Sequence, residues 1–286
     1  MSINFKELSY VYSPTMPYRY TALDKINLSI DEGKITAIIG ETGSGKSTLV
    51  QHLNALLLPS EGSLEVAGYT INANEKTKKL KQLRQRVGLV FQFSEYQLFE
   101  ETILKDVAFG PKNFGASEEE AIAKAKEALK LVGIPESYYE RSPLDLSGGQ
   151  KRRVAIAGIL AMGPEIIVLD EPTAGLDPKG SDEMIKLFCD LNKKFKKTII
   201  LVTHDNEVVY NYADDVVLLS AGKVCLKMNA KDFFDDKDVL NQHNILKPML
   251  IQLKELLNER GFMICDDVRD IKSLVECIKS RRESHE

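Results

Sequence analysis

The 286-residue sequence has no apolar run long enough to cross a bilayer. Its longest apolar runs, such as Ile166–Leu169 and Ile199–Val202, have the length of strands, whereas a membrane-spanning helix needs roughly 20 apolar residues. The sequence also lacks a dense block of Lys or Arg, and its formal net charge is −4. We therefore expect neither a transmembrane chain nor nonspecific binding to nucleic acid or anionic lipid.

Cysteine is scarce, and its spacing does not fit a cysteine-based site. The four cysteines are Cys189, Cys225, Cys265 and Cys277, and they form no C-x-x-C pair. The first six residues, Met-Ser-Ile-Asn-Phe-Lys, do not have the pattern of a signal peptide, so a reducing cytosol is the expectation. With 43% hydrophobic residues, the chain can bury a core as one large domain or as a domain with an appendage.

A phosphate-binding loop is what the sequence does contain. Residues 40–48 follow the apolar run Ile35–Ile39 and have the pattern G-x-x-x-x-G-K-[ST], in which glycines let backbone N–H groups turn towards phosphate oxygens. Lys46 would reach the β and γ phosphates, and Ser47 would offer its hydroxyl to Mg²⁺. The helix that starts here would point its positive end at the anion. The candidate binding residues are Gly40, Glu41, Thr42, Gly43, Ser44, Gly45, Lys46, Ser47 and Thr48.

Strand and helix patterns alternate along the chain, which predicts an α/β fold with a mainly parallel sheet. Residues 3–12 and 23–30 read as strands of a small antiparallel layer, and from about 93 to 160 helical spacing replaces the strand pattern. We expect a phosphate-loop NTPase core with this antiparallel β layer and an α-helical subdomain. The strands expected after the layer are residues 35–39, 87–91, 166–170, 198–203, 216–220 and 223–227.

Two domains are expected: residues 1–228, including the helical subdomain, and a small, mainly helical C-terminal extension, 229–286. In the extension, Pro248 is well placed as a first helical residue. An exposed apolar stripe on so short an appendage would be costly unless it packed on the rest of the chain or on a partner subunit, and we expect contact with a partner subunit, which makes 229–286 a dimerisation or partner-contact extension. The stripe consists of Leu250, Leu253, Leu256 and Leu257.

Two acids, Asp170 and Glu171, end the apolar strand 166–170. In a phosphate-loop fold such a strand tip lies beside the nucleotide, where Asp170 would hold the Mg²⁺ shell, usually through water. Glu171 would orient and polarise the attacking water as a general base. Taken alone, the pair reads equally well as an ordinary polar strand end.

The segment Leu146–Gln150 reads as a second anion site. Ser147 would be a helix N-cap, and Gly148 and Gly149 clear space for a phosphate in front of free N–H groups. One nucleotide does not obviously need two such helix ends from the same chain. The sequence Leu-Ser-Gly-Gly-Gln resembles the signature motif of the ATP-binding cassette (ABC) ATPases, and the resemblance covers roughly residues 3–228, with every family motif in order.

The resemblance implies roles for three further polar residues. Gln92 matches the glutamine that touches Mg²⁺ and the water at the junction with the helical subdomain. His204 matches the histidine that contacts the γ-phosphate, although a lone histidine is more often a core residue. Asp177 matches the loop that crosses to the other subunit.

The ligands that the resemblance implies are ATP and Mg²⁺. Each ATP would lie between Lys46 of one cassette and Ser147, Gly148, Gly149 and Gln150 of the other, so that closure of the dimer drives a membrane partner. Tyr12 matches the aromatic residue that stacks on adenine, with Tyr10 and Tyr18 as rivals. Tyr12 by itself reads equally well as a core aromatic.

The segments Phe91–Thr102 and Ala108–Pro111 resemble the energy-coupling factor transporter ATPases of prokaryotic vitamin and metal-ion uptake, and more the second of their two paralogous subunits. This implies a second, paralogous ATPase, a transmembrane scaffold (T) subunit, a substrate-binding membrane (S) subunit and a peripheral place on the cytoplasmic face of the cell membrane. The aromatic-rich stretch 93–99 would seat a cytoplasmic helix of the scaffold or, alternatively, only cap the subdomain core.

Other functions are open at this stage. The chain would otherwise be the ATPase of another ABC transporter type, or a soluble cassette protein of DNA repair or translation. Proteins of the latter kind usually carry two cassettes or long coiled coils, and this chain has neither. An interaction module with an inactive nucleotide site is disfavoured because Lys46, Asp170, Glu171 and His204 are all present.

Overall fold

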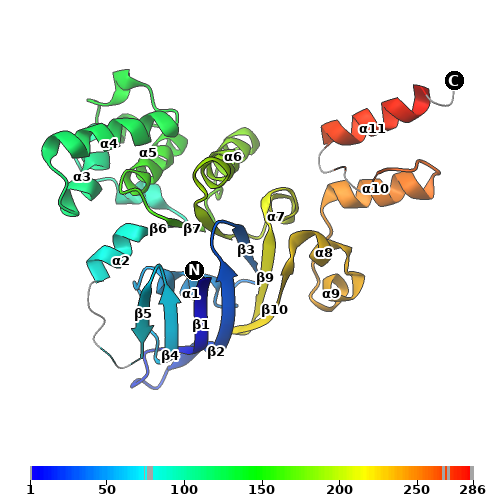
Figure 1. The fold of residues 1–286 in the computed structure, drawn as a ribbon, viewed down its shortest axis with the longest axis horizontal. Helices are drawn as coiled ribbons and strands as arrows, with labels where there is room; N and C mark the ends of the chain where they lie inside the picture. Colours follow the sequence, from blue (N-terminus) through cyan, green and yellow to red (C-terminus); the bar gives the residue numbers. More distant parts are fainter. Residues whose placement is uncertain (1, 74, 76–79, 266–267, 269–270, 284–286) are drawn as a thin grey trace.

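The structure is a computed structural model that describes residues 2–73, 75, 80–265, 268 and 271–283. In this part of the chain, two sheets are flanked by helices, and helices α3 to α5 lie at the opposite end of the molecule from α10 and α11 (Figure 1). No helix in the described ranges is long and apolar enough to span a bilayer.

The smaller sheet is antiparallel and has the strand order β2-β1-β4-β5. Its second strand begins earlier than residue 23, the start that the sequence pattern predicted, because Tyr20 pairs with Tyr12 across the two strands. The strands are β1 (Ser2–Tyr12), β2 (Tyr20–Asp31), β4 (Glu61–Val66) and β5 (Tyr69–Asn72).

The larger sheet has the order β10-β9-β3-β8-β7-β6, and every pair in it is parallel except β10 with β9. The mainly parallel sheet predicted from the apolar runs is therefore confirmed. Its strands are β3 (Ile35–Ile39), β6 (Val87–Val90), β7 (Ile166–Asp170), β8 (Thr198–Val202), β9 (Asp215–Ser220) and β10 (Lys223–Asn229).

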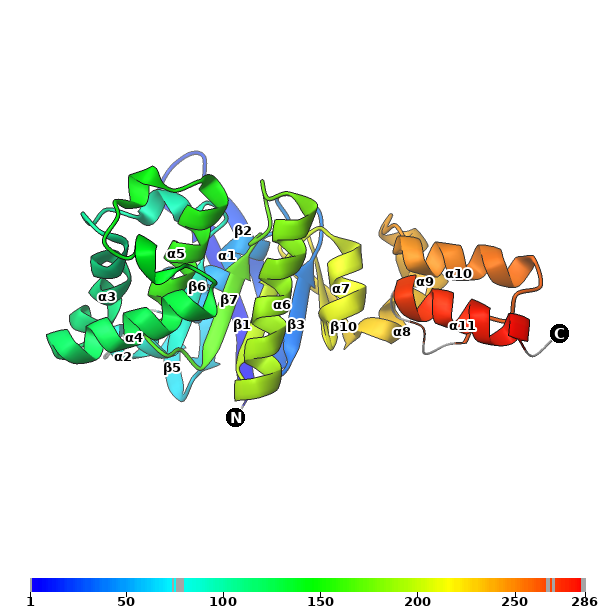
Figure 2. The same ribbon diagram turned by 90° about the horizontal axis from the view of Figure 1, so that it is seen from above.

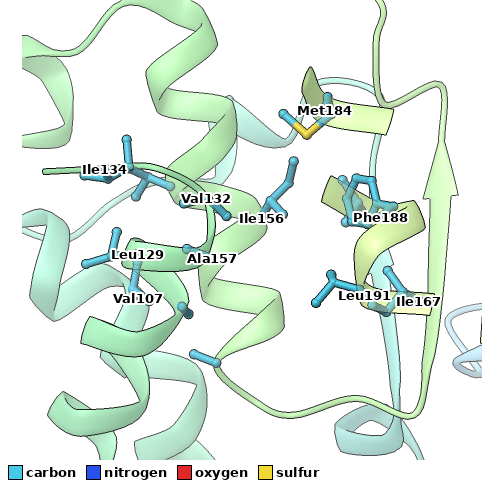
Figure 3. Close-up of a cluster of buried hydrophobic side chains, with 14 of the residues drawn as sticks. Val107, Leu129, Val132, Ile134, Ile156, Ala157, Ile167, Met184, Phe188 and Leu191 are labelled. Atoms are coloured by element: carbon cyan, nitrogen blue, oxygen red, sulfur yellow. The ribbon is translucent and has the colours of Figure 1, made fainter. Parts of the chain in front are cut away.

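The apolar runs of β3, β6, β7 and β8 are continuous because these parallel strands are buried on both faces, whereas the edge strand β10 alternates between exposed and partly buried residues. On β7, Ile167 and Leu169 join the cluster under the helical subdomain, whereas Ile166 and Val168 join the cluster between the two sheets. Figure 3 shows the first cluster, with Ile156 of α5 lying between the subdomain residues and the residues of α6. The large sheet is thus held between two cores, and its carboxyl-terminal edge is left open for a ligand.

Helices surround the large sheet. The helices between strands β3 and β9 are α1 (Lys46–Leu53), α2 (Leu80–Arg86), α3 (Ile103–Asn113), α4 (Glu118–Leu131), α5 (Gly148–Leu160), α6 (Pro178–Phe195) and α7 (Asn206–Tyr212), with short 3₁₀ turns at Ser94–Gln97, Glu136–Tyr138 and Pro143–Asp145. Helices α3, α4 and α5 pack on one another within the range predicted for the helical subdomain.

The C-terminal residues form α8 (Ala230–Asp235), α9 (Lys237–Gln242), α10 (Met249–Glu259) and α11 (Ile271–Glu283). Helix α10 starts one residue later than predicted, with Pro248 as its N-cap. Phe233 and Phe234 share a buried cluster with Ala37 and Ile39 of β3. Figure 2 shows α10 and α11 side by side, and both helices contribute to this cluster, through Leu250, Ile251 and Leu274. The division of the chain at residue 229 stays a prediction.

Candidate functional site

A cleft of about 440 Å³ lies at the carboxyl ends of the parallel strands. Segments from five places in the sequence meet here, because the strand order brings the ends of β3, β6, β7 and β8 to one edge of the sheet and the start of β2 lies beside them. The predicted site residues that line this cleft are Thr42, Gly43, Gly45, Lys46, Ser47, Thr48, Gln92, Asp170, Glu171 and His204.

The loop before α1 needs glycine at two positions. Gly40 has a φ of +144°, and a Cβ there would lie 2.1 Å from the carbonyl oxygen of Leu219. Gly45 has a φ of +101°, and its Cβ would lie 2.7 Å from the carbonyl oxygen of Ala22. These glycines let the loop pack against β2 and β9 while its N–H groups surround the start of α1.

The ammonium group of Lys46 lies inside this loop. Its Nζ donates to the carbonyl oxygens of Gly40 at 2.7 Å and Glu41 at 2.9 Å. Burial lowers the pKa of Lys46, and the charges of Glu171 and Asp170 act in the opposite direction. A half-buried cation in a ring of backbone groups favours an anionic ligand.

Ser47 and Asp170 form a pair of oxygen donors at the floor of the cleft. Ser47 Oγ donates to Asp170 Oδ1 at 3.2 Å. Burial raises the pKa of Asp170; the hydrogen bond from Ser47 opposes this shift, and the charge of Glu171 adds to it. A hydroxyl beside a carboxylate is a donor set that fits Mg²⁺, which takes one or two protein oxygens and completes its shell with water and phosphate.

Glu171 contacts His204 across the cleft. Nδ1 of His204 lies 3.0 Å from Oε1 and 2.9 Å from Oε2 of Glu171. The side chain of His204 is 79% exposed and that of Glu171 only 17%. Glu171 also has a φ of +51°, in the left-handed region that non-glycine residues rarely adopt. The structure around the cleft must hold this strained backbone in place.

The second glycine-rich helix end lies outside this cleft. Ser147 is the N-cap of α5 and forms a capping box with Gln150, whose backbone N–H donates to Ser147 Oγ at 3.4 Å. Ser147, Gly149, Gln150 and Asp177 line a separate hollow of about 260 Å³. A Cβ on Gly148 would meet nothing within 4 Å, so packing inside this chain does not require glycine there.

Five predicted residues line neither hollow: Gly148, described above, and Gly40, Glu41, Ser44 and Tyr12. Ser44 is buried under the loop, and Gly40 and Glu41 line a neighbouring hollow beside His204. Tyr12 is half-exposed behind α1, with its hydroxyl 3.3 Å from Thr48 Oγ1. The adenine role predicted for Tyr12 is not tested by this geometry and stays a prediction.

Tyr20 is a lining residue that the sequence analysis missed. It faces the cleft from the start of β2, and its hydroxyl donates to the carbonyl oxygen of Gly43 at 3.3 Å. The pairing of Tyr12 with Tyr20 could have indicated it, had the second strand been extended back across the turn. Arg152 of α5 was also missed, although it is buried and donates to the carbonyl oxygen of Gln92.

Residues 23–174 match the protein family described as ABC transporter. The chain belongs to the ABC transporter family. As an ABC transporter ATPase, it binds ATP with Mg²⁺ and hydrolyses ATP to ADP and phosphate.

Relatives of this ABC transporter chain are similar along most of its length. It is 51% identical to the energy-coupling factor transporter ATP-binding protein EcfA2 of Spiroplasma kunkelii, over 99% of this chain and 93% of the relative. It is also 51% identical to the protein of the same name from Latilactobacillus sakei, over 92% of this chain and 90% of the relative.

Solved structures agree with the ABC transporter fold. The cbiO1 protein of Clostridium perfringens, described as part of the ABC transporter complex cbiONQ, has a TM-score of 0.73 at 39% identity and covers 90% of this chain and 98% of its own. The ATP-binding cassette MJ0796, solved as a dimer in a post-hydrolysis state bound to ADP and Pi, has a TM-score of 0.71 at 33% identity, covering 80% of this chain and 98% of its own.

Proposed function

We propose that the energy-coupling factor transporter of which this chain is the ATP-hydrolysing subunit imports vitamins or transition-metal ions. The chain would work on the cytoplasmic face of the cell membrane, as a heterodimer with a paralogous ATPase, and bind a transmembrane scaffold subunit that carries a substrate-binding subunit. The observation that carries the proposal is the separation of the two glycine-rich helix ends, at Lys46 and at Ser147, into different hollows of one chain.

Two chains facing head to tail would bring these ends together. The cleft around Lys46 in one chain would then be covered by Ser147 and Asp177 of the other, so that each ATP touches both subunits. The open space at Gly148 supports this arrangement, because a phosphate would occupy it without displacing any part of the same chain. Closure would complete both sites at once and exclude water from them.

Within each site, the residues of the cleft have separable roles. Lys46 would neutralise charge on the β and γ phosphates, while Ser47 and Asp170 would hold Mg²⁺, which supplies further charge neutralisation. Glu171 would accept a proton from the attacking water. Its contact with His204, at 2.9 Å, would fix the carboxylate and place the imidazole towards the γ-phosphate. Gln92 would contact the metal shell and the same water.

Exposed aromatic residues support a contact with the scaffold. Phe93, Tyr96 and Phe99 directly follow Gln92 in the chain and are 50%, 85% and 64% exposed. Residues that only capped the subdomain core would be covered instead. A scaffold helix seated on them would be one covalent step from the nucleotide site.

The extension offers a second surface. The predicted leucine stripe is divided. Leu250 is buried in the cluster that contains Phe233 and Phe234, whereas Leu253 and Leu256 are 37% and 45% exposed. Leu246 and Met249 just before them are 77% and 73% exposed. We infer that this exposed set contacts the partner ATPase.

Purification of the tagged chain from membranes in mild detergent tests the proposal. A second ABC ATPase and two integral membrane proteins should co-purify, and intact mass should show one copy of each ATPase. Tyr96→Ala should lose the membrane proteins and keep the partner ATPase. Leu144→Ala is the matched control, because this apolar side chain in the same subdomain is 80% exposed. Recovery of only DNA-repair or translation proteins would contradict the proposal.

A further inference from the structure

We propose that Arg152 is a positioning residue for ATP hydrolysis. Its side chain holds the backbone at Gln92 at a fixed distance from the segment that follows Glu171. It also connects both segments to α5, the helix whose N-cap is Ser147. The inference rests on the roles proposed above for Gln92 and Glu171. It adds a residue that touches neither the nucleotide nor the attacking water.

The guanidinium group of Arg152 is buried, with 3% of the residue exposed, and all of its nitrogen atoms donate hydrogen bonds. Nε and Nη2 donate to the two carboxylate oxygens of Glu95, at 3.1 and 3.0 Å. Nη2 also donates to the carbonyl oxygen of Gln92 at 3.0 Å. Nη1 donates to the carbonyl oxygens of Pro172, at 3.3 Å, and Ala174.

These acceptors come from two segments that belong to the cleft. Gln92 and Glu95 lie on the segment that leaves β6, and Pro172 and Ala174 lie on the segment that leaves β7 just after Glu171. One rigid, planar group therefore fixes the distance between both segments. A displacement of about 1 Å in such a catalytic arrangement costs as much as 100-fold in rate.

A role in stability alone explains this arrangement poorly. Desolvating a buried ion pair costs free energy, and apolar residues of similar volume often stabilise a core at least as well. The arginine also fixes the directions of its hydrogen bonds, because the five N–H groups of the planar guanidinium have a fixed geometry. Arg152 also lies on α5, the helix whose N-terminus would meet the partner's nucleotide. A shift of that helix on closure would reach Gln92 and Pro172 directly.

The chain contains a matched control pair. Arg86 also forms a bidentate ion pair with a glutamate, Glu165, and donates a hydrogen bond to one carbonyl oxygen, that of Ala67. This pair lies at the amino-terminal ends of β6 and β7, at the edge of the sheet away from the cleft, and its side chains are 37% and 55% exposed. The same substitutions can therefore be compared at both pairs.

The test uses Arg152→Lys and Glu95→Gln, with Arg86→Lys and Glu165→Gln as controls, in the complete transporter complex. Lysine keeps the charge at position 152 but cannot reach all of the acceptors. We expect Arg152→Lys to lower kcat by about 10- to 100-fold and to leave KM and ATP affinity within about threefold of wild type. Glu95→Gln should lower kcat less, because the bonds from Arg152 to the three carbonyl oxygens remain. The control variants should leave kcat unchanged.

Three results would overturn the inference: a folded Arg152→Lys variant with kcat within about threefold of wild type, an equal loss of kcat in the control variants, or a parallel loss of kcat and ATP affinity. If Arg152→Lys does not fold, Glu95→Gln decides, since it removes the charge of the glutamate without changing its shape. A kcat below that of the Glu165→Gln control would support the inference, and an equal kcat would overturn it. Glu171→Gln in the same complex separates the two proposals: if it hydrolyses ATP normally, the role proposed for Glu171 fails, whatever Arg152 does.

Discussion

The two glycine-rich helix ends of this chain are built for different purposes. At the start of α1, Gly40 and Gly45 have positive φ, and a Cβ on either would collide with backbone of the same chain. At the start of α5, Gly148 has no neighbour within 4 Å of the Cβ position. The first set of glycines lets the loop fold, whereas the second leaves room for something outside the chain. One helix end can therefore be tested in the isolated chain, and the other only in the assembled complex.

The largest effect on hydrolysis is expected on the cleft side of this comparison. Glu171→Gln should lower kcat by about 100- to 10,000-fold, because the amide keeps the shape of the side chain but cannot accept the proton of the attacking water. ATP affinity should remain close to that of wild type. Steady-state ATP hydrolysis and binding of a fluorescent ATP analogue measure the two quantities. Normal turnover would remove Glu171 from this role.

Lys46→Ala should act on binding itself. The variant removes a charge-assisted hydrogen bond to phosphate, which contributes about 1.5–3 kcal/mol, so ATP affinity should fall by roughly 10- to 100-fold. Titration of the isolated chain measures this, because Lys46 is part of the cleft. Lys193→Ala on α6, away from the cleft, is a control that should bind ATP normally. Equal affinity in the Lys46 variant would contradict the phosphate-loop assignment.

The glycines themselves give the sharpest contrast between the two ends. Gly148→Ala should fold as well as wild type or gain about 0.4–1 kcal/mol, and should lower turnover of the assembled complex roughly tenfold by filling the space for phosphate. Gly40→Ala should fail to fold or lose several kcal/mol, since its Cβ would lie 2.1 Å from Leu219 O. Thermal unfolding of the isolated chain compares them, and equal destabilisation would remove the distinction.

The smallest effect on activity is expected from His52, at the buried end of α1. Burial lowers the pKa of His52 from 6.5 to about 4, against the opposing effect of its hydrogen bond with the carbonyl oxygen of Thr48. Between about pH 6.5 and about pH 4, His52 is protonated in the unfolded chain but not in the folded chain. The free energy of unfolding is therefore highest above about pH 6.5. It falls by up to about 3 kcal/mol as the pH decreases to about 4.

His52→Gln should remove most of this pH dependence and leave hydrolysis at neutral pH nearly unchanged. Urea unfolding at about pH 7 and about pH 5 measures the difference. His52 lies on α1 and α5 contains no histidine, so the part of the pH dependence that this substitution removes belongs to the first helix end. An unchanged pH dependence in the variant would exclude His52 as its source.

Much of the fold followed from short-range patterns in the sequence. Continuous apolar runs marked the strands of the large sheet, and the acids after Ile166–Leu169 marked its open edge. The loop 40–48 was recognisable because its glycines and Lys46 lie close together in the chain. All of these features depend on neighbours in sequence.

Features that depend on distant neighbours were missed. Tyr20 lines the cleft because of the register between β1 and β2, and no local pattern sets that register. Arg152 meets Glu95 across 57 residues of sequence and is one of two adjacent arginines. The leucine stripe of α10 had helical spacing, but which of its leucines are buried depends on how the helix packs against the cluster that contains Phe233 and Phe234.

The left-handed backbone of Glu171 has a consequence for attempts to stabilise this protein. Holding a non-glycine residue at a φ of +51° costs on the order of 1–3 kcal/mol. Glycine or asparagine would adopt this conformation with less strain. A library of variants selected only for heat resistance would therefore be expected to enrich Glu171→Gly and Glu171→Asn. Such a selection would recover a more robust protein that no longer carries the carboxylate we assign as the base.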